Sequence, residues 1–371
     1  MFTKKRDVAL IIFKAFDLPN NRKKMNFSIN KQWFENKLNF LDDLFTSAES
    51  TKSLGLGVRL FIYTFIVLLL ITIGLMFYWD TEPDSFTVNR EGQVVGQAFT
   101  ESLIKTGETL LNKRGGYLSN DVIPPSVLMD NIPNWEFGAL VMLRDGSAAL
   151  RNHFSRSQSQ SVENNDLATA EPQFNFQNDA WIIPSSEGEY ELGIKRLKSY
   201  NTSLGDQTKQ EAQFFARADN LVNYLVIVEK RLGSLSQRLS ASVATVRSNT
   251  DLAGDGSAQQ STESSKILAV KTSWSKIDDV FYEARGTTWA LLHQLKGIEA
   301  DFKDVLNKKN AMPSVNQIIR ELEVTQEPVF SPMILNGRGF GMTANYSLVM
   351  ANYISRANAA IIDLRSLLER G

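Results

Sequence analysis

The sequence predicts a mostly α-helical protein, with one N-terminal transmembrane helix followed by a helical-bundle domain. Three observations predict this class. A charge-free apolar run covers Leu60–Trp79, apolar residues recur three and four positions apart in much of the tail, and the stretch 117–184 between them shows little regular pattern. The bundle is therefore expected to contain a long heptad-patterned helical hairpin and an irregular loop region rich in aromatic residues and proline.

The run Leu60–Trp79 is long enough to cross a membrane. At a rise of about 1.5 Å per residue, a helix of this length spans a hydrocarbon core of ~30 Å. Arg59 and Asp80 flank the run, and aromatic residues suited to the headgroup region lie near its ends: Tyr63, Tyr78 and Trp79. The alternative is a buried helix of a soluble protein, but such helices are rarely apolar on every face.

Charge divides the chain into a basic head and an acidic tail. Residues 1–59 carry 11 Lys and Arg against 6 Asp and Glu, which leaves 29 against 35 for the remainder. The positive-inside rule then predicts that the head (1–53) is cytoplasmic, that 54–79 is a transmembrane helix, and that the helical domain (80–371) lies on the other side of the membrane. The acidic tail argues against a nucleic-acid partner, because phosphate binding requires clustered Lys and Arg.

The first 24 residues have two interpretations. They form either a basic segment that lies in the membrane interface or the product of a mis-assigned start, with translation beginning at Met25. We favour the second interpretation, although the head then loses its net positive charge. Residues Asn26–Ala48 are expected to form an amphipathic helix.

Between the anchor and the middle of the tail, two helices are expected. Val94–Leu111 has helical spacing and is stopped by Gly115 and Gly116. A helix from Ser186 to about Tyr200 begins with a capping box of Ser186 and Glu189. In the irregular stretch between these helices, we expect a short helix at 135–149 and an extended piece around Phe174 and Phe176.

The longest heptad patterns lie in the second half of the tail. Apolar residues step by three and four along Leu221–Val243 and again along Trp274–Val305, and the polar segment 248–265 separates them. The two helices are expected to form an antiparallel hairpin that packs on further helices, because Trp274 and Phe281 are too large for a two-stranded seam. A C-terminal helix is expected at Ala344–Leu368.

Chemical sites are scarce. The chain has no cysteine and two isolated histidines, His153 and His293, so thiolate and Cys–His sites are excluded and no cofactor or metal site is predicted. Both histidines are interpreted as structural or exposed. The cluster Asn336–Gly341 has G-x-G-x-G spacing, which indicates a tight turn between helices and not a nucleotide-binding loop. We predict that the protein is not an enzyme.

Two weaker hypotheses concern named side chains. Asp278, Asp279 and Glu283, together with Glu101, are the best carboxylates for an envelope polysaccharide hydrolase, although charges on a heptad helix usually form its solvated face. The stretch 117–137 is the candidate partner surface, with Tyr117, Trp135 and Phe137 as anchors. The alternative for that stretch is a loop packed down by its own aromatic residues.

Several long motifs resemble a bacterial family catalogued as domain of unknown function 2333: GGYLSNDVIPPSVLMDNIPNWEFG, SRSQSQS, WIIPSSEGEY and RLGSLSQRLSASV. The resemblance runs from the anchor to the C-terminus and leaves out residues 1–24. It implies a bacterial inner-membrane protein with a periplasmic tail, and it implies no activity.

These observations favour a non-enzymatic, single-pass membrane protein whose periplasmic helical domain is a scaffold or protein-interaction module of the cell envelope. Its expected partners are the membrane, through Leu60–Trp79, and a protein, which includes a second copy of the chain. The alternative is a periplasmic ligand-sensing domain or, less favoured, an envelope hydrolase.

Overall fold

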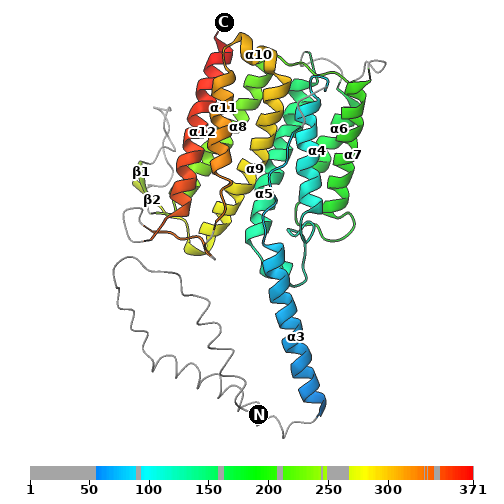
Figure 1. Ribbon diagram of the computed structural model, residues 1–371, viewed down its shortest axis with the longest axis vertical. Helices are drawn as coiled ribbons and strands as arrows, with labels where there is room; N and C mark the ends of the chain where they lie inside the picture. The colour runs from blue at the N-terminus through cyan, green and yellow to red at the C-terminus, as the bar shows by residue number, and fades with distance from the viewer. Residues whose placement is uncertain are drawn as a thin grey trace, which may run out of the picture. The chain divides into compact units, whose positions relative to one another are not determined.

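In a computed structural model, residues 56–88, 93–157, 163–206, 212–243, 245–248, 267–329, 331, 333–337 and 343–370 are described (Figure 1). The chain divides into two units between Leu69 and Leu70, and each is treated by itself. The expected head, the Met25 start, the amphipathic helix 26–48, most of the linker 248–265 and most of the glycine cluster 336–341 lie outside the described residues.

Helix α3, Leu56–Trp79, contains the charge-free run, and its last residue coincides with the predicted end of the transmembrane helix. The run Leu60–Trp79 has a mean hydropathy of 2.7, and none of it is buried in the protein. It is the one helix among the described residues that is long and apolar enough to cross a membrane. The division between the two units falls inside this helix, so the predicted limits at residues 53 and 79 remain predictions.

The second unit is mostly helical, as predicted, and its helices form a bundle (Figure 1). A short antiparallel pair of strands joins α8 to α9, with Thr245 opposite Val270. The described elements are α4 Gln97–Asn112, α5 Asn131–Ala149, α6 Asn165–Phe174, α7 Ser186–Gly205, α8 Ala218–Ser240, β1 Thr245–Ser248, β2 Ile267–Val270, α9 Ile277–Asp301, α10 Lys303–Lys308, α11 Met312–Val324 and α12 Tyr346–Glu369.

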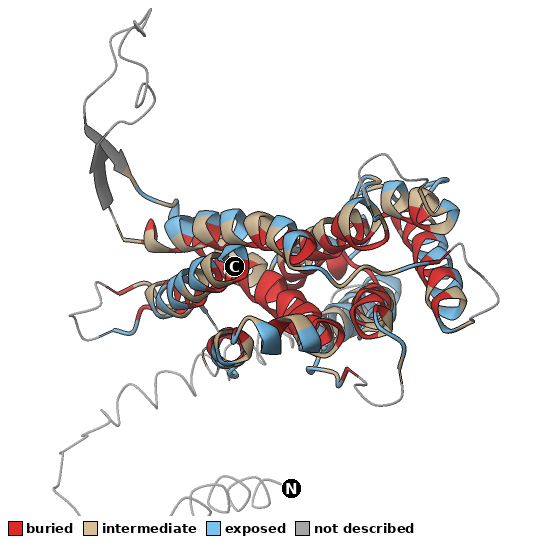
Figure 2. Ribbon diagram, turned by 90° about the horizontal axis from the view of Figure 1, so that it is seen from above, coloured by how far each residue is buried: buried red, intermediate tan, exposed pale blue. Residues whose placement is uncertain are grey.

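Helix α9 lies in the middle of the bundle and packs chiefly on α5 and α4, with α11 on a further side. Twelve consecutive residues, 284–295, are buried, so this helix is covered on every face and not only along a heptad seam. Figure 2 shows buried residues along the inward faces of the bundle and exposed residues on its outer faces. The sequence pattern therefore underestimates how completely α9 is enclosed.

The two heptad-patterned helices do not form the expected close hairpin. The apolar row of α8, from Leu221 to Leu239, is buried, but it packs mainly against α12, and α8 contacts α9 over a short stretch only. Glycines explain the preference of α9 for α5. A Cβ at Gly286 would overlap the carbonyl group of Trp135, and one at Gly138 would lie 2.8 Å from the backbone nitrogen of Thr287. The two backbones therefore touch where α5 crosses α9.

The expected irregular region contains more helix than the sequence predicts. The helix expected at 135–149 begins at Asn131, continues into a π-helical turn at Leu150–Phe154, and is followed by α6. The extended piece expected at Phe174 and Phe176 is wrong, because Phe174 is the last residue of α6. The Asn164 side chain caps this helix by accepting hydrogen bonds from the N–H groups of the second and third residues after it, 166 and 167.

Helix ends in this region follow local chemistry. Gly115 and Gly116 have φ values of 84° and 76° just after α4 and confirm the predicted stop. The expected cap of α7 is displaced by one residue. Ser185 is the N-cap and accepts a hydrogen bond from Gly188, whereas the buried hydroxyl of Ser186 donates to the Gln177 carbonyl at 2.7 Å.

Candidate functional site

The candidate partner surface is corrected by the structure. Trp135 is completely buried against Trp289, with ring centroids 5.0 Å apart. Tyr117 is also buried, and its hydroxyl donates to the Asn178 carbonyl at 3.1 Å. Phe137 is half-buried at the edge of a shallow hollow between α5 and α8. Tyr117 and Trp135 therefore stabilise the interior and present no anchor to a partner.

Three of the four carboxylates considered for hydrolysis are held in separate ion pairs, and the fourth, Asp278, accepts a hydrogen bond from the Asp279 backbone nitrogen at 3.3 Å. Glu101 pairs with Lys105 one turn away, at 2.7 Å, Asp279 pairs with Lys276, and Glu283 pairs with Arg238. The structure brings no two of these pairs together around a shared cavity, and no cluster of metal-ligating side chains exists within the described parts of the chain. In the described parts of the chain, these ion pairs join residues within one helix, as Glu101 with Lys105, or residues of two helices, as Glu283 with Arg238.

His293 has a structural environment, as the sequence predicts. Its Nδ1 lies 2.7 Å from the Trp289 carbonyl, and its Nε2 accepts a hydrogen bond from the Phe86 backbone at 3.0 Å, so the ring is the neutral Nδ1–H tautomer. Phe86 stacks on the imidazole at 3.7 Å. Burial lowers the pKa of His293 to about 4.

Asp301, the last residue of the same helix, α9, is the opposite case. It is buried, and its carboxylate accepts a hydrogen bond from the Phe99 backbone nitrogen at 2.7 Å, in the first turn of α4. Burial raises the pKa of Asp301 to about 6, although hydrogen bonds from the backbone of 96, 98 and 99 act in the other direction.

These two groups give opposite pH dependences of stability. Between about pH 4 and 6.5 the unfolded state binds a proton at His293 that the folded state does not, so His293 makes stability rise with pH. Between pH 3.8 and about 6 the folded state holds a proton on Asp301 that the unfolded state has released, so Asp301 makes stability fall with pH. Each contribution is about 3 kcal/mol over its window.

Single variants are expected to separate the two effects. Relative to the parent, His293→Gln should lose stability as pH rises from 4 to 6.5, whereas Asp301→Asn should gain stability from pH 4 to 6. Urea unfolding of the full chain in detergent, followed by circular dichroism at several pH values, measures both differences. A difference from the parent that stays constant across pH 4–7 would contradict the assignment for that residue.

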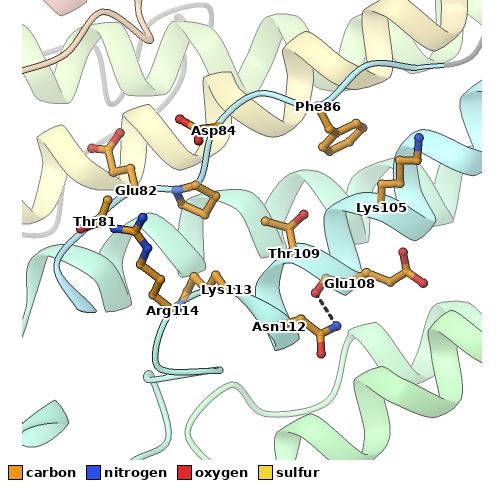
Figure 3. A pocket seen from close by; sticks show the side chains of 11 residues that line it. Thr81, Glu82, Asp84, Phe86, Lys105, Glu108, Thr109, Asn112, Lys113 and Arg114 are labelled. Carbon is orange, nitrogen blue, oxygen red and sulfur yellow. Dashed lines mark hydrogen bonds between the residues drawn. The ribbon is translucent and has the colours of Figure 1, made fainter. Parts of the chain in front are cut away.

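A groove of about 650 Å³ lies between the segment after α3 and helix α4 (Figure 3). Charged side chains line it, with Glu82 and Asp84 on one side and Lys105, Glu108 and Arg114 on the other. Lys105 and Glu108 are paired with Glu101 and Lys198, respectively. Apolar atoms of the lining residues, such as those of Phe86, also face the groove.

Two buried ion pairs hold the walls of this groove. Arg285 of α9 donates hydrogen bonds to both carboxylate oxygens of Glu82 at 2.6–2.8 Å. Arg285 also donates hydrogen bonds to the carbonyls of Thr325 and Glu327, just after α11. Lys113, at the end of α4, pairs with the fully buried Glu136 of α5 at 2.5 Å. The first pair fixes the segment after α3 to the bundle, and the second joins α4 to α5.

The sequence alone does not predict this arrangement, because Thr81–Val88 has the composition of a polar spacer. In the structure the spacer is attached at two points, through Glu82 on Arg285 and through Phe86 on His293. One signal was present in the sequence, because Phe86 is a large apolar residue within the spacer.

Comparison with known protein families agrees with the family resemblance that the sequence motifs indicate. A family model described as an uncharacterized protein conserved in bacteria, DUF2333, matches residues 51–371. The chain belongs to this family. The match begins just before α3 and includes the whole bundle, so α3 and the helical domain are both part of the family, and residues 1–24 lie outside it. No curated protein and no solved structure matches the chain.

Proposed function

We propose that this family member is anchored in the bacterial inner membrane by α3 and that its helical bundle is a non-enzymatic scaffold or interaction module of the cell envelope. In this proposal residues 1–53 are cytoplasmic and residues 80–371 are periplasmic. The observation that carries it is the run Leu60–Trp79, which lacks charge and is entirely unburied. Each apolar side chain of this kind gains about 1.5–3 kcal/mol on leaving water, so lipid is the environment that stabilises the run.

The architecture of the bundle supports a scaffold role. The segment that follows α3 is fixed on α9 by Arg285 and Glu82, and α9 is enclosed by neighbouring helices along its middle. Because these contacts fix the bundle to its anchoring segment, the outer faces of the bundle keep a constant position near the membrane. Exposed apolar side chains on those faces, such as Leu192, Trp274 and Ile362, are available to a partner.

Membrane extraction tests the anchor. The full chain is expected to sediment with membranes and to resist alkaline carbonate. The double variant Leu69→Arg/Leu70→Arg should be extracted or degraded, because each arginine at the helix centre costs about 3 kcal/mol. The matched control is Leu192→Arg on α7, which adds the same charge to an exposed position of the bundle and should stay in the membrane. Release of the parent chain by carbonate would contradict the proposal.

In-cell photo-crosslinking tests the scaffold role. Photoreactive residues are placed at Trp274, Leu192 and Ile362, which are exposed, with the buried Trp135 as the negative control. The expected result is a reproducible crosslink to one envelope protein or to a second copy of the chain, identified by mass spectrometry. No crosslink from any exposed position would contradict the scaffold role.

The groove favours the second candidate, a ligand-sensing domain. Its volume of about 650 Å³ is within the ~300–1,000 Å³ of many small-molecule sites, and both charged and apolar residues line it. A small molecule that raises the melting temperature of the full chain, and that loses this effect in Arg114→Ala, would favour sensing over scaffolding.

A further inference from the structure

Two loops at one end of the bundle expose apolar side chains instead of burying them. The first, loop A, is 122–129, and the second, loop B, is 180–186; neither contains an ionisable residue. Leu128 in loop A is 61% exposed, and Ile183 in loop B is 95% exposed. Nearly half of the exposed large apolar side chains described outside α3 lie in these loops, namely Val122, Ile123, Val127, Leu128, Trp181, Ile182 and Ile183. Such clustering indicates a contact surface.

The protein holds the two loops together. Asn120, just before loop A, donates hydrogen bonds to the Ala180 carbonyl at 2.9 Å and to Glu187 at 2.6 Å, on both sides of loop B. Inside loop B, the hydroxyl of Ser186 accepts a hydrogen bond from the Ala180 backbone at 3.1 Å. The loops connect α4 to α5 and α6 to α7 at the same end of the bundle (Figure 1). The exposed side chains are therefore displayed by an ordered backbone and form one surface.

This surface is continuous with the apolar face of α3 in the second unit. A hollow of about 260 Å³ is lined by Ile73, Met76 and Phe77 of α3 and by Leu128 and Met129 of loop A, and the polar residues Asp80, Asp130 and Asn131 complete its lining. Ile73 lies six residues before Trp79, which corresponds to about 9 Å along the helix. Loop A therefore lies beside the apolar part of α3, and not beyond its end.

We propose that loops A and B insert into the outer leaflet of the same membrane that α3 spans, at the boundary between headgroups and acyl chains. The proposal rests on α3 being a transmembrane anchor. An apolar loop beside Ile73 and Phe77 then lies about 5–10 Å inside the membrane surface, the depth typical of interfacial segments. Trp181 suits this boundary because its amphipathic ring favours the headgroup region.

The charges around the loops favour lipid over a protein partner at this surface. Ionisable residues occur at the edges of the loops, at Asp121, Asp130, Asp179 and Glu187, and neither the eight residues of loop A nor the seven residues of loop B carry a charge. Insertion by apolar burial alone requires no basic patch and no anionic lipid. The bundle would then rest on the membrane at two places, α3 and the loops, which fixes its tilt.

Depth measurement by spin labelling tests this inference on the full chain. The chain contains no cysteine, so single variants Leu128→Cys and Ile183→Cys can each carry one nitroxide without other substitutions. In vesicles of phosphatidylcholine, the ratio of accessibility to oxygen over accessibility to a water-soluble nickel chelate reports burial in lipid. The matched control is Val349→Cys on α12, which is exposed and apolar but lies outside the loops.

The expected result is an oxygen-to-nickel ratio several-fold higher at Leu128 and Ile183 than at Val349. A fourth variant, Ile66→Cys in α3, separates this inference from the anchor itself. If Ile66 shows a high ratio and both loop positions match Val349, the inference is overturned and the anchor stands. If Ile66 also matches Val349, the anchor and the inference are both overturned. Circular dichroism melting of each labelled variant confirms that the bundle is folded.

Discussion

Gly286→Ala is expected to destabilise the bundle by about 3 kcal/mol or more. The added Cβ overlaps the Trp135 carbonyl group and lies 2.8 Å from its carbon and 3.0 Å from the Ala139 nitrogen. These are backbone atoms, so relief requires α5 and α9 to move apart and not a side chain to rotate. Overpacking typically costs ~1–3 kcal/mol, and separating the helices also opens space around Trp135 and Trp289.

Gly233→Ala in α8 is the matched control. A Cβ there has one neighbour, the side-chain nitrogen of Asn358 at 3.7 Å, so the substitution gains the helix propensity of alanine, up to about 1 kcal/mol, without a clash. Chemical unfolding of the full chain in detergent measures both variants. Equal stabilities of Gly286→Ala and Gly233→Ala would contradict the contact between α5 and α9.

Gly138→Ala provides an independent check of the same crossing. Its Cβ would meet the Glu283 backbone carbon at 2.9 Å from the opposite helix, so it is expected to cost about as much as Gly286→Ala. Because both substitutions push α5 and α9 apart, the double variant should cost less than the sum of the two single variants. Additive losses would show that the two glycines act at separate contacts.

The sequence predicts which residues of α8 are buried better than it predicts which helices touch. The row from Leu221 to Leu239 is buried as its spacing indicates, since spacing reports the face of a helix. Partner choice depends on how closely two backbones approach. In α9 the small residue Gly286 decides this, because it admits α5, and a heptad pattern contains no such information.

The candidate site shows a related limit. Tyr117 and Trp135 have the composition of interface anchors, yet both are buried, because a turn rich in proline and glycine lets an aromatic residue fold back onto its own bundle as readily as face a partner. Conversely, Glu82 lies in a segment that resembles a linker, and its ion pair with Arg285 joins residues about 200 positions apart. Single-sequence patterns report local spacing and carry no signal for a pair so distant.

Lys113→Met is expected to destabilise the bundle by about 3–5 kcal/mol at neutral pH. The substitution keeps much of the side-chain volume and removes the ammonium group, leaving the fully buried carboxylate of Glu136 without a counter-charge. The carboxylate still accepts hydrogen bonds from the backbone nitrogens of Leu118 and Ser119 at 2.9 and 2.8 Å. These two bonds do not replace a full positive charge.

The pH dependence of this variant identifies the cause of the loss. Burial already raises the pKa of Glu136 in the parent, and the ammonium group of Lys113 opposes that effect. Without Lys113 the folded-state pKa rises further. The folded state of the variant then binds a proton more tightly than the unfolded state does, so its stability relative to the parent is lowest at high pH and recovers as pH falls.

Two controls complete the experiment. Lys276→Met removes the same charge from an exposed pair with Asp279 and should cost much less stability than Lys113→Met, because solvent screens the exposed pair. The double variant Lys113→Met/Glu136→Gln removes both charges and should recover part of the lost stability, because no uncompensated charge remains buried. If Lys113→Met costs no more than Lys276→Met, or if its loss is independent of pH, the buried pair does not hold α4 on α5.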